Sequence, residues 1–173
     1  MKVMIYRFTV RTQESPDFLI MVDLDGKHTF LTFHHTLQLQ CRYQPHQLAS
    51  FFILDKKLRK QVEISLLDIG VNEAAFLIMH RTRISDHLHH AGQKLIYTFD
   101  FIDDRSLLIE LTDIIMEKNL NEPYVALFRG EAPVQVLEDF AEQRAAASTE
   151  DTAYHDYGIL DDYVQIFGEM DEF

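Results

Sequence analysis

The stretch from residue 95 to residue 116 constrains the fold most, because it has the pattern of two strands joined by a polar turn. Its first arm alternates large apolar residues with smaller or polar ones. This alternation places Tyr97, Phe99 and Phe101 on one face of a strand. Its second arm is mostly apolar and β-branched, and the polar residues 103–105 between the arms favour a reversal of the chain. We therefore expect an antiparallel hairpin in the middle of a sheet.

Apolar residues at helical spacing predict one main helix over residues 29–41. Phe30, Phe33, Leu37 and Cys41 recur at steps of three and four, so they share one stripe of that helix. Shorter apolar or alternating runs predict strands at residues 2–12, 18–24, 51–54, 62–67 and 124–128. The expected fold class is therefore α+β: a mostly antiparallel sheet with the main helix across one face.

Two segments before the central hairpin carry weaker signals. Residues 74–80 fit either a strand or a short helical turn, and the pattern does not choose between them. Ser85 is expected to cap a short helix over residues 86–91, with Ile84 packing beside it and Gly92 ending it.

The negative charge of the chain is concentrated at its C-terminal end. The formal net charge is −12, and residues 131–173 carry twelve acidic side chains against one basic side chain, Arg144. We therefore divide the chain into an α+β domain at 1–135 and an acidic extension at 136–173, with helix character at 136–147. Acidic surface repels phosphate backbones, so direct nucleic-acid binding by the extension is not supported. The nearly neutral body keeps enough lysine and arginine for a local basic patch.

The extension also interleaves its acids with apolar residues, among them Tyr163, Val164 and Phe167. Three roles fit this composition, and we rank them in the order given. The segment folds back onto the body, or it is a short linear segment for a protein partner that has a basic, apolar groove. In the third role it mimics the charge of a nucleic acid and competes for a DNA-binding partner.

Several sequence features bear on the compartment and on cofactors. The single cysteine, Cys41, has no partner for an internal disulfide, which favours a reducing compartment. The N-terminus lacks a signal-peptide pattern, and no apolar run approaches the roughly 18 residues that span a bilayer. We expect a cytoplasmic protein without membrane contact. We expect no cofactor, because the phosphate-loop, dinucleotide-binding, Gly-x-Ser-x-Gly and HExxH patterns are absent from the sequence. The oligomeric state is not decided by the sequence.

The histidines offer an alternative in the form of a metal site. His87 and His90 would be i, i+3 neighbours on a helix, with Asp86 nearby, which suits a metal if a third ligand arrives. A solvated helix face is the preferred interpretation, because no second element offers ligands at zinc spacing. His34 lies beside the apolar stripe of the main helix, where a half-buried, hydrogen-bonded histidine is the commoner outcome.

Acidic residues near the turn of the central hairpin are the other chemical candidates. Asp100, Asp103 and Asp104 would serve as cation ligands or acid–base groups, but aspartate is also common in turns for bonding the backbone, and we prefer that interpretation. Asp100 lies within the strand, on the face opposite to the aromatic residues. If it is buried it needs a cationic partner, which Arg7 or Arg11 of the first strand would supply.

Three segments, taken together, are similar to the Ri-plasmid open-reading-frame-three-like family, passenger proteins of insertion elements often labelled TnpR-like. They are TFLTFH at 29–34, YQPHQLASF at 43–51 and GQKLIYTFDF at 92–101. The resemblance covers about residues 1–135. It implies an α+β fold with a β-grasp-like strand–strand–helix–strand opening, and it implies no established chemistry.

The chain departs from the family pattern at the hairpin, where Ile102 stands in place of a glycine and the second arm lacks the usual tryptophan and histidine. The TnpR-like label implies a resolvase, and this assignment fails a direct test. A serine recombinase needs a nucleophilic serine beside several arginines, and residues 6–9, Tyr-Arg-Phe-Thr, contain no serine. The label is therefore no guide to activity.

We expect a non-catalytic cytoplasmic binding or accessory protein associated with mobile genetic elements, and we assign no catalytic residue. The candidate binding residues are Tyr97, Asp100, Asp103, His34 and His46. The alternative is a metal-dependent enzyme that acts on nucleic acid through His34, His46, Asp100 and the histidines at 87–90. That enzyme requires at least three of these side chains to meet in one pocket.

Overall fold

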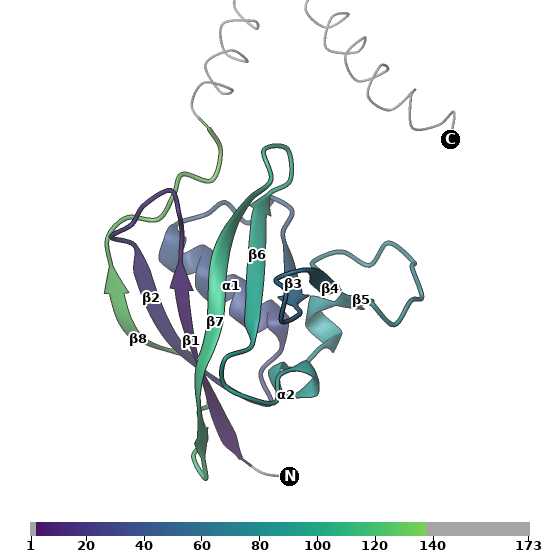
Figure 1. Cartoon of the computed structure of the whole chain (residues 1–173), viewed down its shortest axis with the longest axis vertical. Helices are drawn as coiled ribbons and strands as arrows, with labels where there is room; N and C mark the ends of the chain where they lie inside the picture. Colours follow the sequence, from purple (N-terminus) through teal and green to yellow (C-terminus); the bar gives the residue numbers. More distant parts are fainter. Residues whose placement is uncertain (1–2, 138–173) are drawn as a thin grey trace, which may run out of the picture. The chain divides into compact units, whose positions relative to one another are not determined.

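The expected central hairpin is present in the computed structural model, which describes residues 3–137 (Figure 1). Its arms are β6 (Lys94–Asp100) and β7 (Arg105–Met116), which pair antiparallel. The other strands are β1 (Met4–Arg11), β2 (Leu19–Asp25), β3 (Ser50–Leu54), β4 (Lys60–Ser65), β5 (Phe76–Ile78) and β8 (Tyr124–Arg129). All eight form one sheet in the order β5-β4-β3-β6-β7-β1-β2-β8. Neighbouring strands pair antiparallel except β4 and β5, which run parallel.

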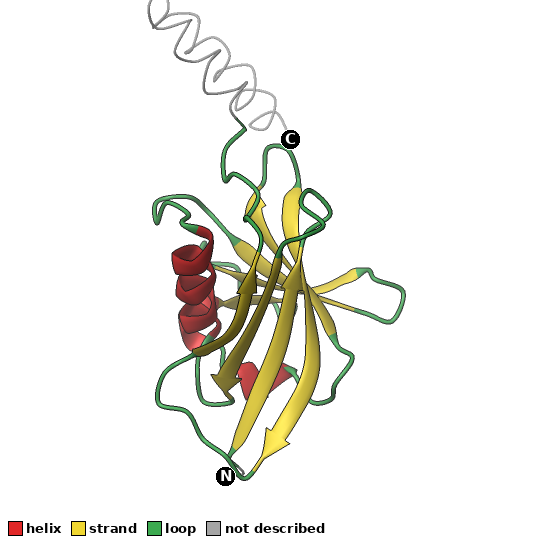
Figure 2. Ribbon diagram, turned by 90° about the vertical axis from the view of Figure 1, so that its left-hand side faces the viewer, coloured by secondary structure: helices red, strands yellow, loops and turns green. Residues whose placement is uncertain are grey.

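Helix α1 (Phe30–Cys41) begins one residue later than the sequence predicted, ends at the predicted residue and covers one face of the sheet (Figure 2). The helix begins where the hydroxyl of Thr29 accepts a hydrogen bond from the backbone N–H of Thr32 at 3.3 Å. It ends after Cys41 because Arg42 takes a left-handed backbone conformation, with φ at 59°.

Aromatic rings join the helix to the sheet. The ring of Phe33 on α1 lies 4.7 Å from that of Phe8 on β1 and 5.1 Å from that of Phe51 on β3, measured between centroids. Phe51 in turn lies 4.9 Å from Tyr97 on β6. All four side chains are buried, and full burial of one such ring contributes roughly 2–3 kcal/mol to stability. This core accounts for the position of α1 over the middle of the sheet.

The short helix predicted at 86–91 is wrong in its extent. Helix α2 spans Ile84–His87, so it begins and ends earlier than expected. The carboxylate of Asp86 accepts a hydrogen bond from the backbone N–H of Arg83 at 2.9 Å, which places the start of the helix at residue 84 and excludes Ser85 as its cap. The helix stops before Leu88 because that fully buried residue takes an extended conformation.

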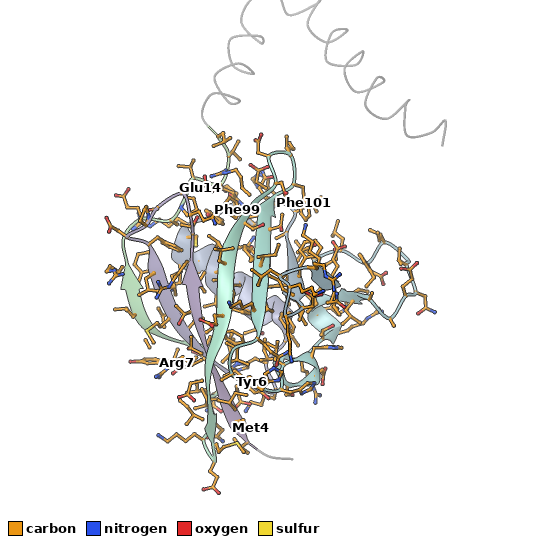
Figure 3. All side chains as sticks on the ribbon, in the orientation of Figure 1. Met4, Tyr6, Arg7, Glu14, Phe99 and Phe101 are labelled. Carbon is orange, nitrogen blue, oxygen red and sulfur yellow. The ribbon has the colours of Figure 1, made fainter. Side chains whose placement is uncertain are left out.

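The prediction that Phe101 shares a buried face with Tyr97 and Phe99 is also wrong. Strand β6 ends at Asp100, and its pairing with β7 is irregular between Thr98 and Asp100. Phe101 therefore lies in the hairpin turn, where it is 48% exposed, whereas Phe99 is buried (Figure 3). An alternation read from sequence holds only while the pleat stays regular.

The segment whose type the sequence left open contains both alternatives. Within residues 74–80, β5 is followed directly by the 3₁₀ helix η1 (Met79–Arg81). The helix expected over 136–147 and most of the acidic extension lie outside the described residues. For that reason the proposed division at residue 135 stays a prediction.

The expected fold class is confirmed at the level of an α+β protein with one mostly antiparallel sheet and few helices. The chain opens in the order β1, β2, α1, β3, while the β-grasp-like character of this opening stays a prediction. Within residues 3–137, none of the helices has the length and apolar character needed to cross a membrane.

Candidate functional site

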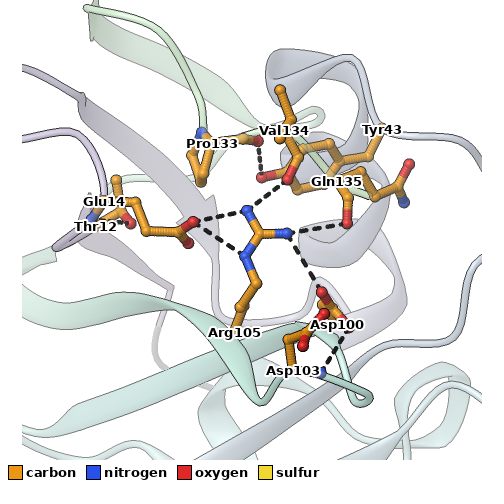
Figure 4. Close-up of polar contacts among 9 residues, drawn as sticks. All are labelled: Thr12, Glu14, Tyr43, Asp100, Asp103, Arg105, Pro133, Val134 and Gln135. Carbon is orange, nitrogen blue, oxygen red and sulfur yellow. Dashed lines mark hydrogen bonds and ion pairs between the residues drawn. The ribbon is translucent and has the colours of Figure 1, made fainter. Parts of the chain in front are cut away.

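A buried polar cluster is centred on Arg105, at the start of β7 (Figure 4). Its side chain is 9% exposed, and its Nε and Nη2 atoms donate to one carboxylate oxygen of Glu14 at 3.0 and 2.7 Å. Its Nη1 atom donates to the carboxylate of Asp100 at 3.3 Å. Burial alone would lower the pKa of Arg105, but the hydrogen bonds and charges of Glu14 and Asp100 outweigh it and hold that pKa above its ordinary value. The guanidinium is therefore a permanent cation in this cluster.

The prediction that Arg7 or Arg11 pairs with Asp100 is wrong, because its partner is Arg105. Asp100 and Arg105 face each other across the hairpin, whereas Arg7 bonds Asp23, its neighbour on β2, at 2.8 and 2.9 Å. In both cases the residue directly opposite on the adjacent strand is the partner.

Asp103 joins this cluster only through its backbone. The other carboxylate oxygen of Asp100 accepts hydrogen bonds from the backbone N–H groups of Ile102 and Asp103, at 3.1 and 3.2 Å. The side chain of Asp103 is exposed. Asp100 therefore shapes the turn, which is the structural role that the sequence favoured.

The same cluster fastens the segment that follows β8. Arg105 donates to the backbone carbonyls of Val134 and Gln135 at 2.7 and 3.3 Å, and the hydroxyl of Tyr43 donates to the carbonyl of Pro133 at 2.7 Å. Burial raises the pKa of Tyr43, so its hydroxyl keeps its proton and remains a donor. These contacts fix residues 133–135 against the end of the sheet. All three guanidinium nitrogens of Arg105 and both carboxylate oxygens of Asp100 are thus engaged within the structure, so the cluster acts as a structural anchor.

His34 and Tyr97 form a second buried pair, between α1 and β6. The Nδ1 atom of His34 and the hydroxyl of Tyr97 lie 2.8 Å apart, and both residues are 1% exposed. Burial, and then the charge of neighbouring His35, lower the pKa of His34 to about 4. The imidazole is therefore neutral at pH 7, and the pair lies in the core rather than in an accessible pocket.

The remaining predicted histidines do not join either cluster. His46 is exposed in the loop before β3, and α2 ends at His87, so His87 and His90 do not share a helix as the metal alternative required. Within residues 3–137, no three histidine, cysteine or acidic side chains are grouped so as to hold a metal ion. The structure thus brings together Asp100 with the backbone of Asp103, and His34 with Tyr97, as two separate pairs.

An open groove lies on the face of the sheet opposite α1. It consists of two hollows of about 340 and 260 Å³, and both are lined by Ile96 of β6 and Leu108 of β7, which pair directly across the strands. Their chain neighbours point into the core beneath α1, so these two side chains point to the opposite face. An apolar wall is added by Leu54, the last residue of β3, and by Leu58 in the turn between β3 and β4. We call this feature the open-face groove.

Charged side chains flank the open-face groove. Arg11, Lys60 and Lys94 line it, and none of them forms an ion pair with another described residue. Two carboxylates without an ion pair in the described part, Asp104 and Glu110, also line it.

Sequence reasoning missed this groove. Its signals were the lysine-rich run at 55–60 and the apolar residues Ile96 and Leu108 on the polar face of two amphipathic strands. Neither signal shows by itself that these residues meet.

The fold and these features define an α+β protein with one eight-stranded sheet, a helix on one face and a groove on the other. The chain belongs to the plasmid pRiA4b ORF-3-like protein family, whose model matches residues 5–158. The family suggested by the three sequence motifs is thereby confirmed, and the match runs past residue 135, where the resemblance of those motifs ended.

A solved structure shows a similar fold. It is described as the crystal structure of a protein of unknown function, MM3350, from Methanosarcina mazei Go1. The two share 18% sequence identity over 90% of this chain and 88% of that chain, with a TM-score of 0.60. At this level of identity the likeness concerns the fold alone. A comparison with curated proteins finds no match.

Proposed function

We propose that this protein is a non-catalytic binding or accessory protein that works in the cytoplasm alongside a mobile genetic element. The observation that carries the proposal is the open-face groove, an accessible surface with an apolar floor. The cations around it form no ion pair with another described residue. The reactive side chains that the sequence singled out support the same proposal. His34 and Asp100 are engaged within the scaffold, and His46 stands apart from both.

The link to a mobile element is supported by the plasmid origin in the name of the family. The cytoplasmic location is supported by the single cysteine: Cys41 is buried and free, and burial raises the pKa of its thiol to about 12. An inert structural thiol of this kind is compatible with a reducing compartment.

We further propose that the acidic residues beyond 137 give a protein partner a second contact, because their charge is far in excess of that of the body. Affinity capture from host cells, comparing the full chain with a chain ended after residue 137, tests this contact. Circular dichroism would first confirm that the shortened chain is folded. Loss of a specific partner from the shortened chain is expected, and equal capture by both chains would remove the extension from the proposal.

Elemental analysis of the purified full chain separates a binding protein from the metal-dependent enzyme. A binding protein is expected to carry no stoichiometric transition metal after dialysis. One metal ion per chain, lost together with enzymatic activity on nucleic acid after chelation, would overturn the non-catalytic assignment.

A further inference from the structure

We propose that the open-face groove binds an extended acidic segment of a partner protein, one whose carboxylates alternate with apolar side chains. This proposal rests on the function proposed above and specifies the kind of partner. It is argued from the shape of the groove, from its apolar floor and from the charges that surround it.

The shape of the groove suits an extended chain. Ser106, Leu108 and Glu110 line it from successive outward positions of β7, so it runs along the strand for roughly 14 Å at about 3.4 Å per residue. The groove is open to solvent, because Leu108 on its floor is 41% exposed and Leu58 on its wall is 59% exposed. An open groove of this length holds four or so residues of a strand-like peptide, whereas a small ligand would be left largely uncovered.

The floor of the groove is apolar and already ordered. Phe52, Ile96 and Leu108 follow one another in register across β3, β6 and β7, so a continuous apolar row crosses the sheet beneath the occupant. Arg11 of β1 is next in register and ends the row with a cation. The ammonium group of Lys60 lies 4.3 Å from the centre of the Phe52 ring, which holds a cation at the rim of this row. Apolar side chains of the occupant would rest on the row, and its carboxylates would reach the rim.

The charge of the groove is opposite in sign to that of the whole chain. Arg11, Lys60 and Lys94 outnumber the two carboxylates at its edge that lack an ion pair in the described part. The hairpin tip that carries Leu58 adds Lys56 and Lys57. On a protein with a net charge of −12, this local excess of cations favours an acidic partner and selects against a basic one.

A nucleic-acid strand is less well matched to the same surface. Proteins that bind single strands offer exposed aromatic rings on which bases stack. Here the aromatic ring of the apolar row, Phe52, is only 9% exposed, whereas the aliphatic Leu108 is 41% exposed. Asp104 and Glu110 also line the groove, and their negative charges would repel a phosphate backbone.

The test uses the full-length protein and a fluorescein-labelled synthetic peptide of about ten residues, in which aspartate alternates with leucine or phenylalanine, a length that exceeds that of the groove. Fluorescence anisotropy is expected to show saturable binding that weakens as salt is raised. The same peptide with asparagine in place of aspartate should bind more weakly. Amide shifts of ¹⁵N-labelled protein should change along β6 and β7.

Variants of the protein locate the site. Leu108→Glu places a carboxylate on the exposed floor and is expected to weaken binding by about tenfold, as the loss of a central anchor contact does. Lys60→Gln should weaken it several-fold. The matched control is Leu39→Glu on α1, which adds the same charge at a position 75% exposed on the other side of the sheet and should leave binding unchanged.

Three results would overturn the proposal. They are the absence of saturable binding, equal affinities of the Leu108→Glu and Leu39→Glu proteins, or a single-stranded oligonucleotide that displaces the peptide and binds more tightly at the same salt. If the peptide does not bind but the full chain still captures a specific partner from host cells, the binding function stands and its surface lies elsewhere. If both fail, the proposed function itself fails.

Discussion

The imidazole of His34 on α1 and the hydroxyl of Tyr97 on β6 share a hydrogen bond of 2.8 Å inside the core. The bond joins the main helix to the central hairpin at a point where both residues are 1% exposed. A polar pair in such a place is favourable only while each group satisfies the other. It also makes the stability of the protein sensitive to the protonation of one histidine.

Stability is expected to fall between pH 6.5 and pH 4 because of His34. The pKa of this histidine is about 4 in the folded protein and about 6.5 in the unfolded chain. Above pH 6.5 both states are neutral. Below it the unfolded chain binds a proton that the folded protein does not, so the free energy of unfolding decreases as the pH falls, by up to about 3 kcal/mol for this one group.

Urea unfolding across this pH range, compared between the parent protein and His34→Gln, measures the effect. The variant should show a shallower pH dependence, while His46→Gln, at an exposed histidine, should keep the parental slope. Parallel curves for the parent and His34→Gln would contradict the assignment.

Tyr97→Phe removes the hydroxyl that His34 contacts and leaves the buried imidazole without that partner. We expect a loss of about 1–2 kcal/mol in the free energy of unfolding, the usual cost of an unsatisfied buried polar group. Tyr124→Phe is the matched control, because Tyr124 is 58% exposed and its change should stay within about 0.5 kcal/mol. Equal small effects of the two substitutions would show that the buried hydrogen bond adds nothing to stability.

Arg105→Met leaves Glu14 and Asp100 without their cation and frees the carbonyls of Val134 and Gln135. The free energy of unfolding is expected to fall by about 3 kcal/mol or more, because removing one partner of a buried ion pair leaves the opposite charge without compensation. Hydrogen exchange at the backbone of Gln44, which donates to the side chain of Gln135 at 2.6 Å, should become faster as residues 133–135 are released.

The control for Arg105 is Arg59→Met, since the side chain of Arg59 is 67% exposed and solvent screens its ion pair with Asp55. If Arg105→Met were no more destabilising than this control, the cluster would not be the anchor that its geometry indicates.

Gly130→Ala and Gly70→Ala form a matched pair, because both glycines have φ at 77°. A β-carbon at Gly70 meets no atom within 4 Å, whereas one at Gly130 would lie 2.6 Å from the backbone oxygen of Asp17. Both variants are expected to lose about 1 kcal/mol of unfolding free energy, because alanine disfavours a left-handed backbone. Only Gly130→Ala also forces the end of β8 away from the loop between β1 and β2. Thermal unfolding should therefore show a difference of about 2 kcal/mol between them, and equal losses would mean that the close contact relaxes freely.

The sequence foresaw the local elements well, and it failed where backbone geometry departed from a regular period. The stripe of Phe30, Phe33 and Leu37 predicted α1, and alternation predicted β6. Phe101 was misplaced because an irregularity in the pairing ends the alternation, and the start of α2 was misplaced because Asp86 caps the helix from inside it. A hydrophobic period is counted along the sequence. It therefore does not show where a β-bulge shifts the alternation or where a residue inside a helix caps its start.

The sequence by itself determined the fold class, the family and the uneven placement of charge, because periodicity, motif order and composition are properties of the chain. Only the tertiary structure decided that Arg105 is the partner of Asp100, that His34 meets Tyr97, and that Leu58, Ile96 and Leu108 line one groove. His34 and Tyr97 are separated by 63 positions in the chain, and Leu58 and Leu108 by a comparable stretch. Such contacts follow from strand order and register, which set distances in space that distances along the chain do not contain.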